Sequence, residues 1–434
     1  MKQFSTFVLL LLFLSGCGKE QPAEDVTAKA DVYVETDTTL DLCMYNTDTL
    51  NPLVTSVKHN AEVLSCLYDS LFTATDQFQA MPDLCTQYSV SEDRCVFSAK
   101  LKKDVRFQGG TYLTAQDAAD SVNRIVSSNG YYKKRLQTVL GAVVEEDVLK
   151  ITFSEPMENI PILLDFPILP GGGFVEEGSI LAPPAPGSGL FSLAAYKVND
   201  ILHLVPNRAH HSGRVPYFET VAIHMAKSEQ DAVSMLENGA VDILAGYVAK
   251  TDSYTPPERI QTASYTGCKY VFLGLHPDKN LGWITEVIFR EQIMPENAVS
   301  ASSPVHPKAG RLLPSYPYEP EEERGAYTLL FCKTTPKRAQ VAAKLAQTLS
   351  SAGVLIKTEG VSEQEYRVRL ARKEYDMFLG ETELLPDFAE KQMYQDTVGL
   401  YFQNEVLLFD EGVTDLEITT LNPYKSIFSW KLYP

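Results

Sequence analysis

Met81–Arg124 reads MPDLCTQYSVSEDRCVFSAKLKKDVRFQGGTYLTAQDAADSVNR and contains the most regular pattern in the chain. Apolar side chains alternate with polar ones on both sides of the polar tetrad Ser91–Arg94. Two such alternating runs around a short polar loop indicate a β-hairpin. If the chain turns within the tetrad, Val90 faces Cys95 across the two strands.

A helix is predicted shortly after this hairpin. Val105–Phe107 is expected to form one more short strand, which stops at Gly109 and Gly110 because glycine adopts a positive φ at little cost. Thr114 stands three residues before Asp117, the spacing of an N-cap hydroxyl and a carboxylate that favours a helix N-terminus. Behind them, helical periodicity predicts one apolar face, made of Ala115, Ala118, Val122 and Ile125.

This order of hairpin, short strand, glycine pair and capped helix resembles the signature of the family 5 extracellular solute-binding proteins, the peptide and nickel receptors of ABC importers. The family pattern is approximately P-x-L-A … Y-x-F-x-L-R-x-x-V-x-F-x-D/N-G-x-P-x-T-A-x-D-V. The residues that match it are Pro82, Leu84, Phe97, Leu101, Val105, Phe107, Gly110, Thr114, Ala115 and Asp117. Those that depart from it are Cys85, Lys102, Gly109 and Tyr112. These positions are structural, and none of them is expected to bind a ligand.

The resemblance spans essentially the whole mature chain and implies a mixed α/β fold. The expected architecture is the two-lobe, class II periplasmic-binding-protein-like fold with an extra subdomain. The expected division is lobe I at residues 38–58, 168–265 and 398–434, subdomain II at 59–167, and lobe III at 266–397. Relatives usually spend many more residues between Ile293 and Tyr327, so lobe III is expected to be reduced.

Periodicity also predicts individual elements outside the matched stretch. Single helices are expected at Asn60–Phe72 and at Trp283–Ile293. From Tyr327 onward, strands alternate with amphipathic helices, which predicts a βαβαβ unit with parallel strands. Its strands are expected at 327–332, 354–358 and 375–380, and its helices at 336–350 and 362–373.

The N-terminus has the features of an exported lipoprotein. Residues 1–16 hold Lys2 and an apolar run that is shorter than the about 20 residues needed to span a bilayer, which predicts a signal peptide. Leu14-Ser15-Gly16-Cys17 matches the bacterial lipobox, which implies cleavage before Cys17 and acylation of that residue. Residues 17–37 are acidic and polar and are expected to form a flexible tether. The protein is therefore expected on the outer face of the cytoplasmic membrane, or facing the periplasm or outer membrane in a two-membrane cell.

Six cysteines follow Cys17, and they are expected to be free, buried thiols. Most lie in apolar or strand-like surroundings, where a thiol behaves as a small apolar side chain. In the expected hairpin Cys85 faces Lys100, about five residues away from Cys95 and at roughly 16 Å from it. That separation is too large for a disulfide.

Charge and histidine spacing argue against two classes of ligand. The formal net charge of −18 at pH 7 argues against nucleic acid and against electrostatic docking on an anionic membrane. The adjacent residues His210 and His211 would point to opposite faces of a strand, so surface positions are expected rather than a metal pair. No cysteine or histidine spacing fits structural zinc, and neither a metal nor a cofactor is predicted.

The expected ligand site follows the strand at 375–380, because ligands of open α/β sheets bind beyond the carboxyl ends of the strands. The loop there begins with Glu381, Thr382 and Glu383 and leads to Pro386. The resemblance implies a carboxylate in this loop that grips the α-ammonium of a bound peptide, and the family's Asp position falls on Thr382. Either neighbouring glutamate could reach the same point, or the ammonium site is lost; a solvated acidic loop is the alternative.

The opposite wall is expected to come from the strand Lys269–His276. Tyr270 and Phe272 share one face of an extended run. Tyr270 is the candidate platform for a ligand side chain, with core packing as the alternative.

The function implied by the resemblance is that of a monomeric receptor which traps short peptides between two lobes and delivers them to the permease subunits of an ABC importer. A receptor for a nickel or haem-type chelate and a degenerate receptor that serves as a sensor or scaffold remain alternatives. The chain contains no G-x-S-x-G, H-E-x-x-H or P-loop motif, so an exported hydrolase is not favoured and no catalytic residue is predicted.

Overall fold

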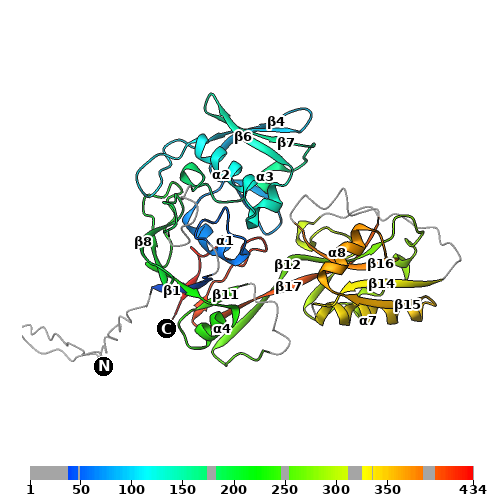
Figure 1. The fold of residues 1–434 in the computed structure, drawn as a ribbon. Coiled ribbons are helices and arrows are strands. Elements are labelled where there is room, and N and C mark those ends of the chain that lie inside the picture. Colours follow the sequence, from blue (N-terminus) through cyan, green and yellow to red (C-terminus); the bar gives the residue numbers. More distant parts are fainter. Residues whose placement is uncertain are drawn as a thin grey trace, which may run out of the picture. The chain divides into compact units, whose positions relative to one another are not determined.

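The structure is a computed structural model that describes residues 38–46, 49–173, 182–245, 254–310, 325–334, 336–384 and 396–433 (Figure 1). Residues Asp37–Pro434 form one compact unit. The predicted signal peptide, Cys17 and the tether lie outside the described residues, as does the loop from Leu385 to Asp387.

The first sheet joins the start of the chain to its middle. Its strand order is β1, β10, β9, β8, with β1 parallel to β10 and the other pairs antiparallel. The strands are β1 (Thr39–Tyr45), β8 (Phe191–Lys197), β9 (Ile201–Pro206) and β10 (Thr220–Ala226). The helices next to it in sequence are α1 (Lys58–Leu64) and α4 (Glu229–Glu237).

The second sheet contains the predicted hairpin. Its order is β4 (Cys85–Val90), β5 (Val96–Leu101), β7 (Val148–Phe153) and β6 (Val139–Glu145), all antiparallel. The hairpin is confirmed, but its expected register is wrong, because Val90 pairs with Phe97 and not with Cys95. Cys95 belongs to the turn: its N–H donates to Asp93, and Arg94 before it has a positive φ of 57°.

The capped helix is confirmed as α2 (Ala115–Ser127). Thr114 accepts a hydrogen bond from the Asp117 N–H while the Asp117 carboxylate accepts from the Thr114 N–H, a complete capping box. The four predicted inward residues are all buried. The strand expected at Val105–Phe107 does not form, since only one isolated bridge links Arg106 to Tyr112.

The third sheet runs β11, β17, β12, β16, β14, β15, with β13 paired to β17. The predicted parallel unit is confirmed, because β14 is parallel to both β15 and β16. Its elements are β14 (Ala326–Cys332), α7 (Pro336–Ser351), β15 (Leu355–Val361), α8 (Glu363–Ala371) and β16 (Met377–Glu383). The rest of the sheet is β11 (Ile243–Ala245), β12 (Ile260–Leu275), β13 (Ala298–Ser300) and β17 (Thr397–Asp410).

The strands β12 and β17 run side by side and pair along most of their length (Figure 1). Ile260 and Val406 pack with residues of β1 and α4 in one core, whereas Val271 and Val398 pack with α7 in another. The pairing is interrupted between Thr266 and Tyr270 by a register shift. Two long strands therefore connect the two cores.

The helix expected at Asn60–Phe72 ends earlier. It comprises α1 and a following 3-10 turn, η1 (Ser65–Leu67). The Leu67 carbonyl accepts a hydrogen bond from the Gly189 N–H at 2.9 Å. The N–H of a loop distant in sequence thus occupies the carbonyl oxygen that would accept a hydrogen bond within a longer helix.

The helix expected at Trp283–Ile293 is broken into α5 (Ile284–Val287) and α6 (Arg290–Ile293). Ile288 and Phe289 between them have extended backbone angles. The remaining elements are β2 (Phe72–Ala74), β3 (Ala80–Pro82), η2 (Tyr131–Leu136), α3 (Ile160–Leu163), η3 (Pro170–Gly172), η4 (Pro307–Ala309), β18 (Val413–Thr414) and β19 (Lys431–Leu432).

The cysteine prediction is confirmed for the disulfide state. All six cysteines after the N-terminal segment are free. Cys66 and Cys95 are half-buried, and the buried ones are Cys43, Cys85, Cys268 and Cys332.

Candidate functional site

Glu381, Thr382 and Glu383 lie inside strand β16 and not in the loop that was expected after it. The reason is the antiparallel pairing with β12, which continues until Lys269 faces Glu383. The three side chains therefore have fixed positions on a sheet, and Glu381 and Glu383 point to the same face because strand side chains alternate.

Glu381 is engaged with a helix of its own lobe. The Arg338 guanidinium, near the start of α7, donates to both carboxylate oxygens of Glu381, with Nη2 at 2.6 Å and Nε at 3.2 Å. A bidentate pair of this kind is geometrically specific. This carboxylate therefore contributes to packing of α7 against the sheet.

Tyr270 is fully buried, so the structure places it in the core. Its ring stacks on Phe272 at 5.8 Å between centroids and packs against Phe402 at 5.1 Å. The predicted shared face of Tyr270 and Phe272 is confirmed. A role as an exposed ligand platform would need this cluster to open.

Glu383 belongs to a charged cluster that joins three elements. The ammonium of Lys58, at the start of α1, lies 3.3 Å from Glu383, 3.2 Å from Glu405 of β17 and 3.8 Å from Glu62 of α1. Tyr265 of β12 donates to the other oxygen of Glu405 at 2.9 Å. We call Lys58, Glu62, Glu383 and Glu405 the Lys58 cluster.

Burial governs the protonation of this cluster. Burial raises the pKa of Glu62 to about 8, and the charges of Glu405 and Glu383 add to this while Lys58 opposes it. Burial alone would lower the pKa of Lys58, but the neighbouring carboxylates outweigh it, and the pKa is raised well above its usual value. At neutral pH, one ammonium therefore faces two carboxylates and a protonated Glu62, which leaves one negative charge.

A second lysine ammonium lies on the same part of β16. Lys134, an exposed residue of η2, donates to the Thr382 hydroxyl at 3.1 Å and to the Glu383 carbonyl at 2.8 Å. Of the three predicted ligand residues on β16, Thr382 and Glu383 therefore contact ammonium groups of the chain itself, and Glu381 does not.

A small polar cavity adjoins the Lys58 cluster. It is lined by Glu62, Tyr131 and Arg135 on one side and by the ion pair of Asp165 with Lys425, 2.9 Å long, on the other. Its free space is about that of one water molecule. A ligand larger than water must therefore bind outside this cavity.

Sequence reasoning missed Lys58, Glu62, Glu405 and Lys134. Lys58 and Glu62 have the i,i+4 spacing of a helical ion pair, which was a visible signal. Glu405 is a lone acid within the run YFQNEVLLF, and a charge inside an apolar strand is rarely buried without a partner. Lys134 had no distinguishing sequence signal.

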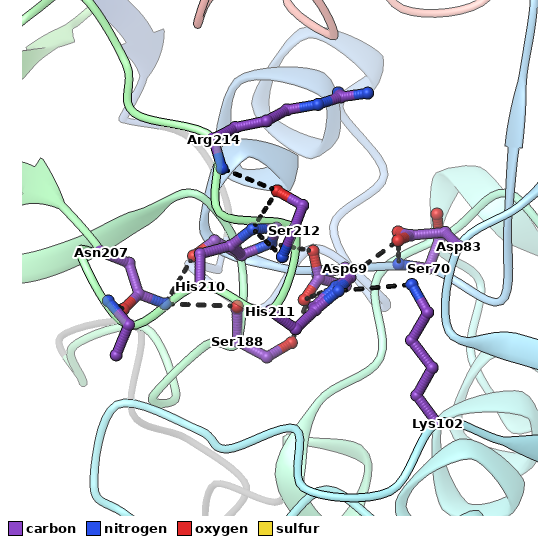
Figure 2. Close-up of polar contacts among 12 residues, drawn as sticks. Asp69, Ser70, Asp83, Lys102, Ser188, Asn207, His210, His211, Ser212 and Arg214 are labelled. Carbon is purple, nitrogen blue, oxygen red and sulfur yellow. Dashed lines mark hydrogen bonds and ion pairs between the residues drawn. The ribbon is translucent and has the colours of Figure 1, made fainter.

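His210 and His211 are not the surface residues that were expected. They follow β9 in a turn, where adjacent side chains can face one point, and both rings approach the buried Asp69 (Figure 2). The strand geometry assumed for them therefore does not apply.

Among the described residues, no helix combines the length and the apolar character that a membrane crossing requires. Residues 79–282 match the sequence model of the "Bacterial extracellular solute-binding proteins, family 5 Middle". This match includes the hairpin, the glycine pair and α2, which carried the resemblance.

The chain is similar to the probable D,D-dipeptide-binding periplasmic protein DdpA of Escherichia coli, with 21% identity over 349 residues, 72% of this chain and 67% of that protein. Across three curated relatives the aligned part covers from 44% to 67% of their own lengths.

Two solved structures share the fold across nearly the whole chain. The ABC transporter substrate binding protein CtaP of Listeria monocytogenes gives a TM-score of 0.67 at 15% identity, covering 92% of this chain and 100% of that one. The oligopeptide-binding protein AppA of Bacillus subtilis, in complex with a nonapeptide, gives 0.58 at 16% identity with the same coverage. The expected mixed α/β, two-lobe class of fold is thereby confirmed. Residues 79–282, slightly less than half of the chain, thus carry the sequence pattern of the family 5 extracellular solute-binding proteins, a family of transport receptors and not of enzymes.

Proposed function

We propose that this protein captures short peptides and delivers them to the permease subunits of an ABC importer. The strongest support for a peptide ligand comes from one observation. The position at which the family resemblance implies recognition of a peptide α-ammonium already holds ammonium groups, from Lys58 at Glu383 and from Lys134 at Thr382. The surroundings of Glu383 thus suit an ammonium ligand.

The two lysines differ in how easily a ligand could replace them. Lys58 contacts three acidic side chains and is mostly buried, so it stays in place. Lys134 is exposed, and exposed polar contacts of lysine contribute about 0–1 kcal/mol at most. A peptide ammonium can therefore displace Lys134 at small cost and neutralise the charge left on the Lys58 cluster.

The proposed capture is a shift between open and closed arrangements of the two lobes. The two connecting strands, β12 and β17, each contribute to both apolar cores, and the register shift at Thr266–Tyr270 interrupts their pairing. An interruption of this kind is a natural place for bending. Peptides of many sequences could be held by backbone hydrogen bonds, as in strand addition.

The proposal includes a lipid anchor. Acylation of Cys17 would attach a monomer to the membrane through the tether at residues 17–37, with the binding unit outside the cell membrane. The anchor would keep the receptor close to its permease.

Native mass spectrometry of the gently purified full chain tests the proposal, followed by denaturation to release anything that it carries. A set of short peptides supports the peptide receptor and gives the preferred length. A single non-peptide mass would favour the chelate receptor. A chain that carries nothing and shows no thermal shift with mixed di- to pentapeptides would overturn the transport receptor and favour a degenerate one.

A further inference from the structure

A second cluster of ionisable side chains, which shares no residue with the Lys58 cluster, lies on segments that precede and follow the second sheet in the sequence. Figure 2 shows it in close-up. Asp69 follows η1, and its buried carboxylate lies between the two histidine rings. His210 Nε2 is 2.9 Å from one oxygen of Asp69, and His211 Nε2 is 3.4 Å from the other. Asp83, which follows β3, is 3.5 Å from His211 Nε2.

The backbone turn after β9 holds both rings on the same side. The His210 N–H donates to the Asn207 carbonyl at 3.0 Å, and the Asn207 side chain donates to the Gly189 carbonyl at 2.9 Å. The two ring centroids are 4.3 Å apart. These backbone contacts fix the turn that carries both rings, and His210 is held further by its ring nitrogens, which contact Ser212 at 2.7 Å and Asp69 at 2.9 Å.

Two atoms at the centre of the cluster lack a hydrogen bond. Asp69 Oδ2 and His211 Nε2 are both buried, and within the described part of the chain neither has a partner of acceptable hydrogen-bond geometry. The two atoms are only 3.4 Å apart, so the missing hydrogen bond between them is not explained by distance. Buried polar atoms without partners are rare, because each costs about 1–3 kcal/mol. A cation between them would satisfy both.

The separations at His211 fit coordination, whereas His210 Nε2 lies at hydrogen-bond distance from Asp69, 2.9 Å. Two ligand atoms at about 2.1 Å from one tetrahedral zinc ion lie roughly 3.4 Å apart. The His211 nitrogen has this separation from Asp69 at 3.4 Å and from Asp83 at 3.5 Å. The candidate ligand atoms of Asp69, His210 and His211 all lie within 4.8 Å of one another.

We propose that Asp69, His210 and His211 bind one divalent transition-metal ion of the zinc type, with Asp83 placed to complete the coordination. Two imidazole nitrogens and carboxylate oxygens are a donor set that suits zinc and its neighbours in the first transition row. The ion would connect the turn after β9 to the segments before β2 and after β3. This site is separate from the proposed peptide site.

The surroundings supply charge and orientation for such an ion. The carboxyl groups of Asp69 and Asp83 supply oxygen donors to such an ion. His210 Nδ1 lies 2.7 Å from the Ser212 hydroxyl and accepts from the Ser212 N–H at 3.2 Å. With an ion on Nε2, Nδ1 would carry the proton and donate it to the hydroxyl, and the Ser212 N–H would turn away from it.

The Lys102 ammonium must move when an ion binds. Its ammonium lies 3.3 Å from His211 Nδ1, which carries a proton once Nε2 binds an ion. Lys102 is only half-buried, so its ammonium can turn toward solvent. Lys102→Met is accordingly expected to strengthen metal binding.

The test is metal binding by the detergent-solubilised full chain after treatment with EDTA and dialysis. Titration with ZnCl₂, followed by calorimetry and elemental analysis, should give one zinc per chain and a rise in melting temperature, whereas MgCl₂ should give neither. Co²⁺ in place of Zn²⁺ should produce the visible absorption of a tetrahedral site. Failure to bind Zn²⁺ stoichiometrically would overturn the proposal.

Two matched variants test whether the bound zinc ion lies at His211. His211→Gln, which keeps a polar group of similar size, should weaken zinc binding at least about tenfold and abolish the Co²⁺ spectrum. His224→Gln is the control, because His224 pairs with Asp41 at 2.5 Å on another part of the chain. If His211→Gln binds zinc as well as the wild type, the ion is held elsewhere and the assignment is wrong.

Discussion

The ammonium nitrogen of Lys58 lies 3.2 Å from Oε1 of Glu405, and this contact ties the first helix to the middle of strand β17. The two residues are 347 positions apart in the chain. The same ammonium reaches Glu383 of β16, so one lysine connects helix α1 to two strands of the third sheet.

Replacing Lys58 with methionine should destabilise the fold. The change leaves Glu405 and Glu383 close together without their cation. Breaking a buried ion pair costs about 3–5 kcal/mol, and an exposed pair contributes roughly 0–1 kcal/mol. Because 28% of the Lys58 side chain is exposed, we expect an intermediate loss, about 2 kcal/mol. Urea unfolding measures it, with Lys150→Met at the exposed pair with Glu145 as control. Equal unfolding midpoints for the two variants would contradict this view of the cluster.

Glu383→Gln should weaken peptide binding while the protein stays folded. A hydrogen bond to a charged group contributes about 1.5–3 kcal/mol, which corresponds to a rise in Kd of about 10- to 150-fold. Calorimetry with a peptide released from the native protein would measure this loss. Glu381→Gln is the matched control, since that carboxylate binds Arg338 and should not touch the ligand. The same peptide with an acetylated N-terminus should bind wild type and Glu383→Gln equally; a preserved difference would argue against ammonium recognition.

Lys134→Ala should bind peptide slightly more tightly than the wild type. The variant removes the ammonium that the ligand must displace from Thr382 and Glu383. Because exposed contacts of this kind contribute at most about 1 kcal/mol, the gain in affinity should be about fivefold or less. Lys133→Ala serves as the neighbouring control. A loss of affinity in Lys134→Ala would mean that this lysine contacts the ligand directly.

Glu62 should make the protein less stable as the pH rises. Its pKa is raised from the usual 4.5 to about 8, chiefly by burial. Above pH 4.5 the Glu62 carboxyl group loses its proton in the unfolded chain but keeps it in the folded chain. The free energy of unfolding therefore falls between about pH 4.5 and 8. Glu62→Gln keeps a neutral polar group and removes this effect. Its melting temperature relative to wild type should therefore rise by at least about 2 °C between pH 5 and pH 8. A difference that does not change with pH would contradict the raised pKa.

The cysteines should differ sharply in reactivity. Burial raises the pKa of Cys43, Cys66 and Cys268 to about 12, so these thiols should not react with a disulfide reagent in the folded protein. Cys95 is half-buried in the hairpin turn and should react first. A thiol titration of the native chain should show one fast group, which Cys95→Ser removes, and the others should react after unfolding. A fast phase that persists in Cys95→Ser would show that a core thiol is accessible.

The sequence by itself determined some of the local elements and carried the family resemblance, whereas the strand at Val105–Phe107 and the full helices at Asn60–Phe72 and Trp283–Ile293 were predicted wrongly. The Thr114 to Asp117 spacing specified the cap of α2, and the alternating pattern after Tyr327 specified the parallel βαβαβ unit, because both depend on neighbours within a few residues. The resemblance carried by Met81–Arg124 was confirmed by the family match over residues 79–282.

Only the tertiary structure decided which side chains meet. The register of β12 on β16 places Glu383 on a strand. The backbone turn after β9 directs the side chains of His210 and His211 toward Asp69. Local pattern gives the direction of a side chain only where the backbone is regular. Contacts such as that of Lys58 with Glu405 depend on strand register and on turns stabilised by distant segments, and these are properties of the whole folded chain.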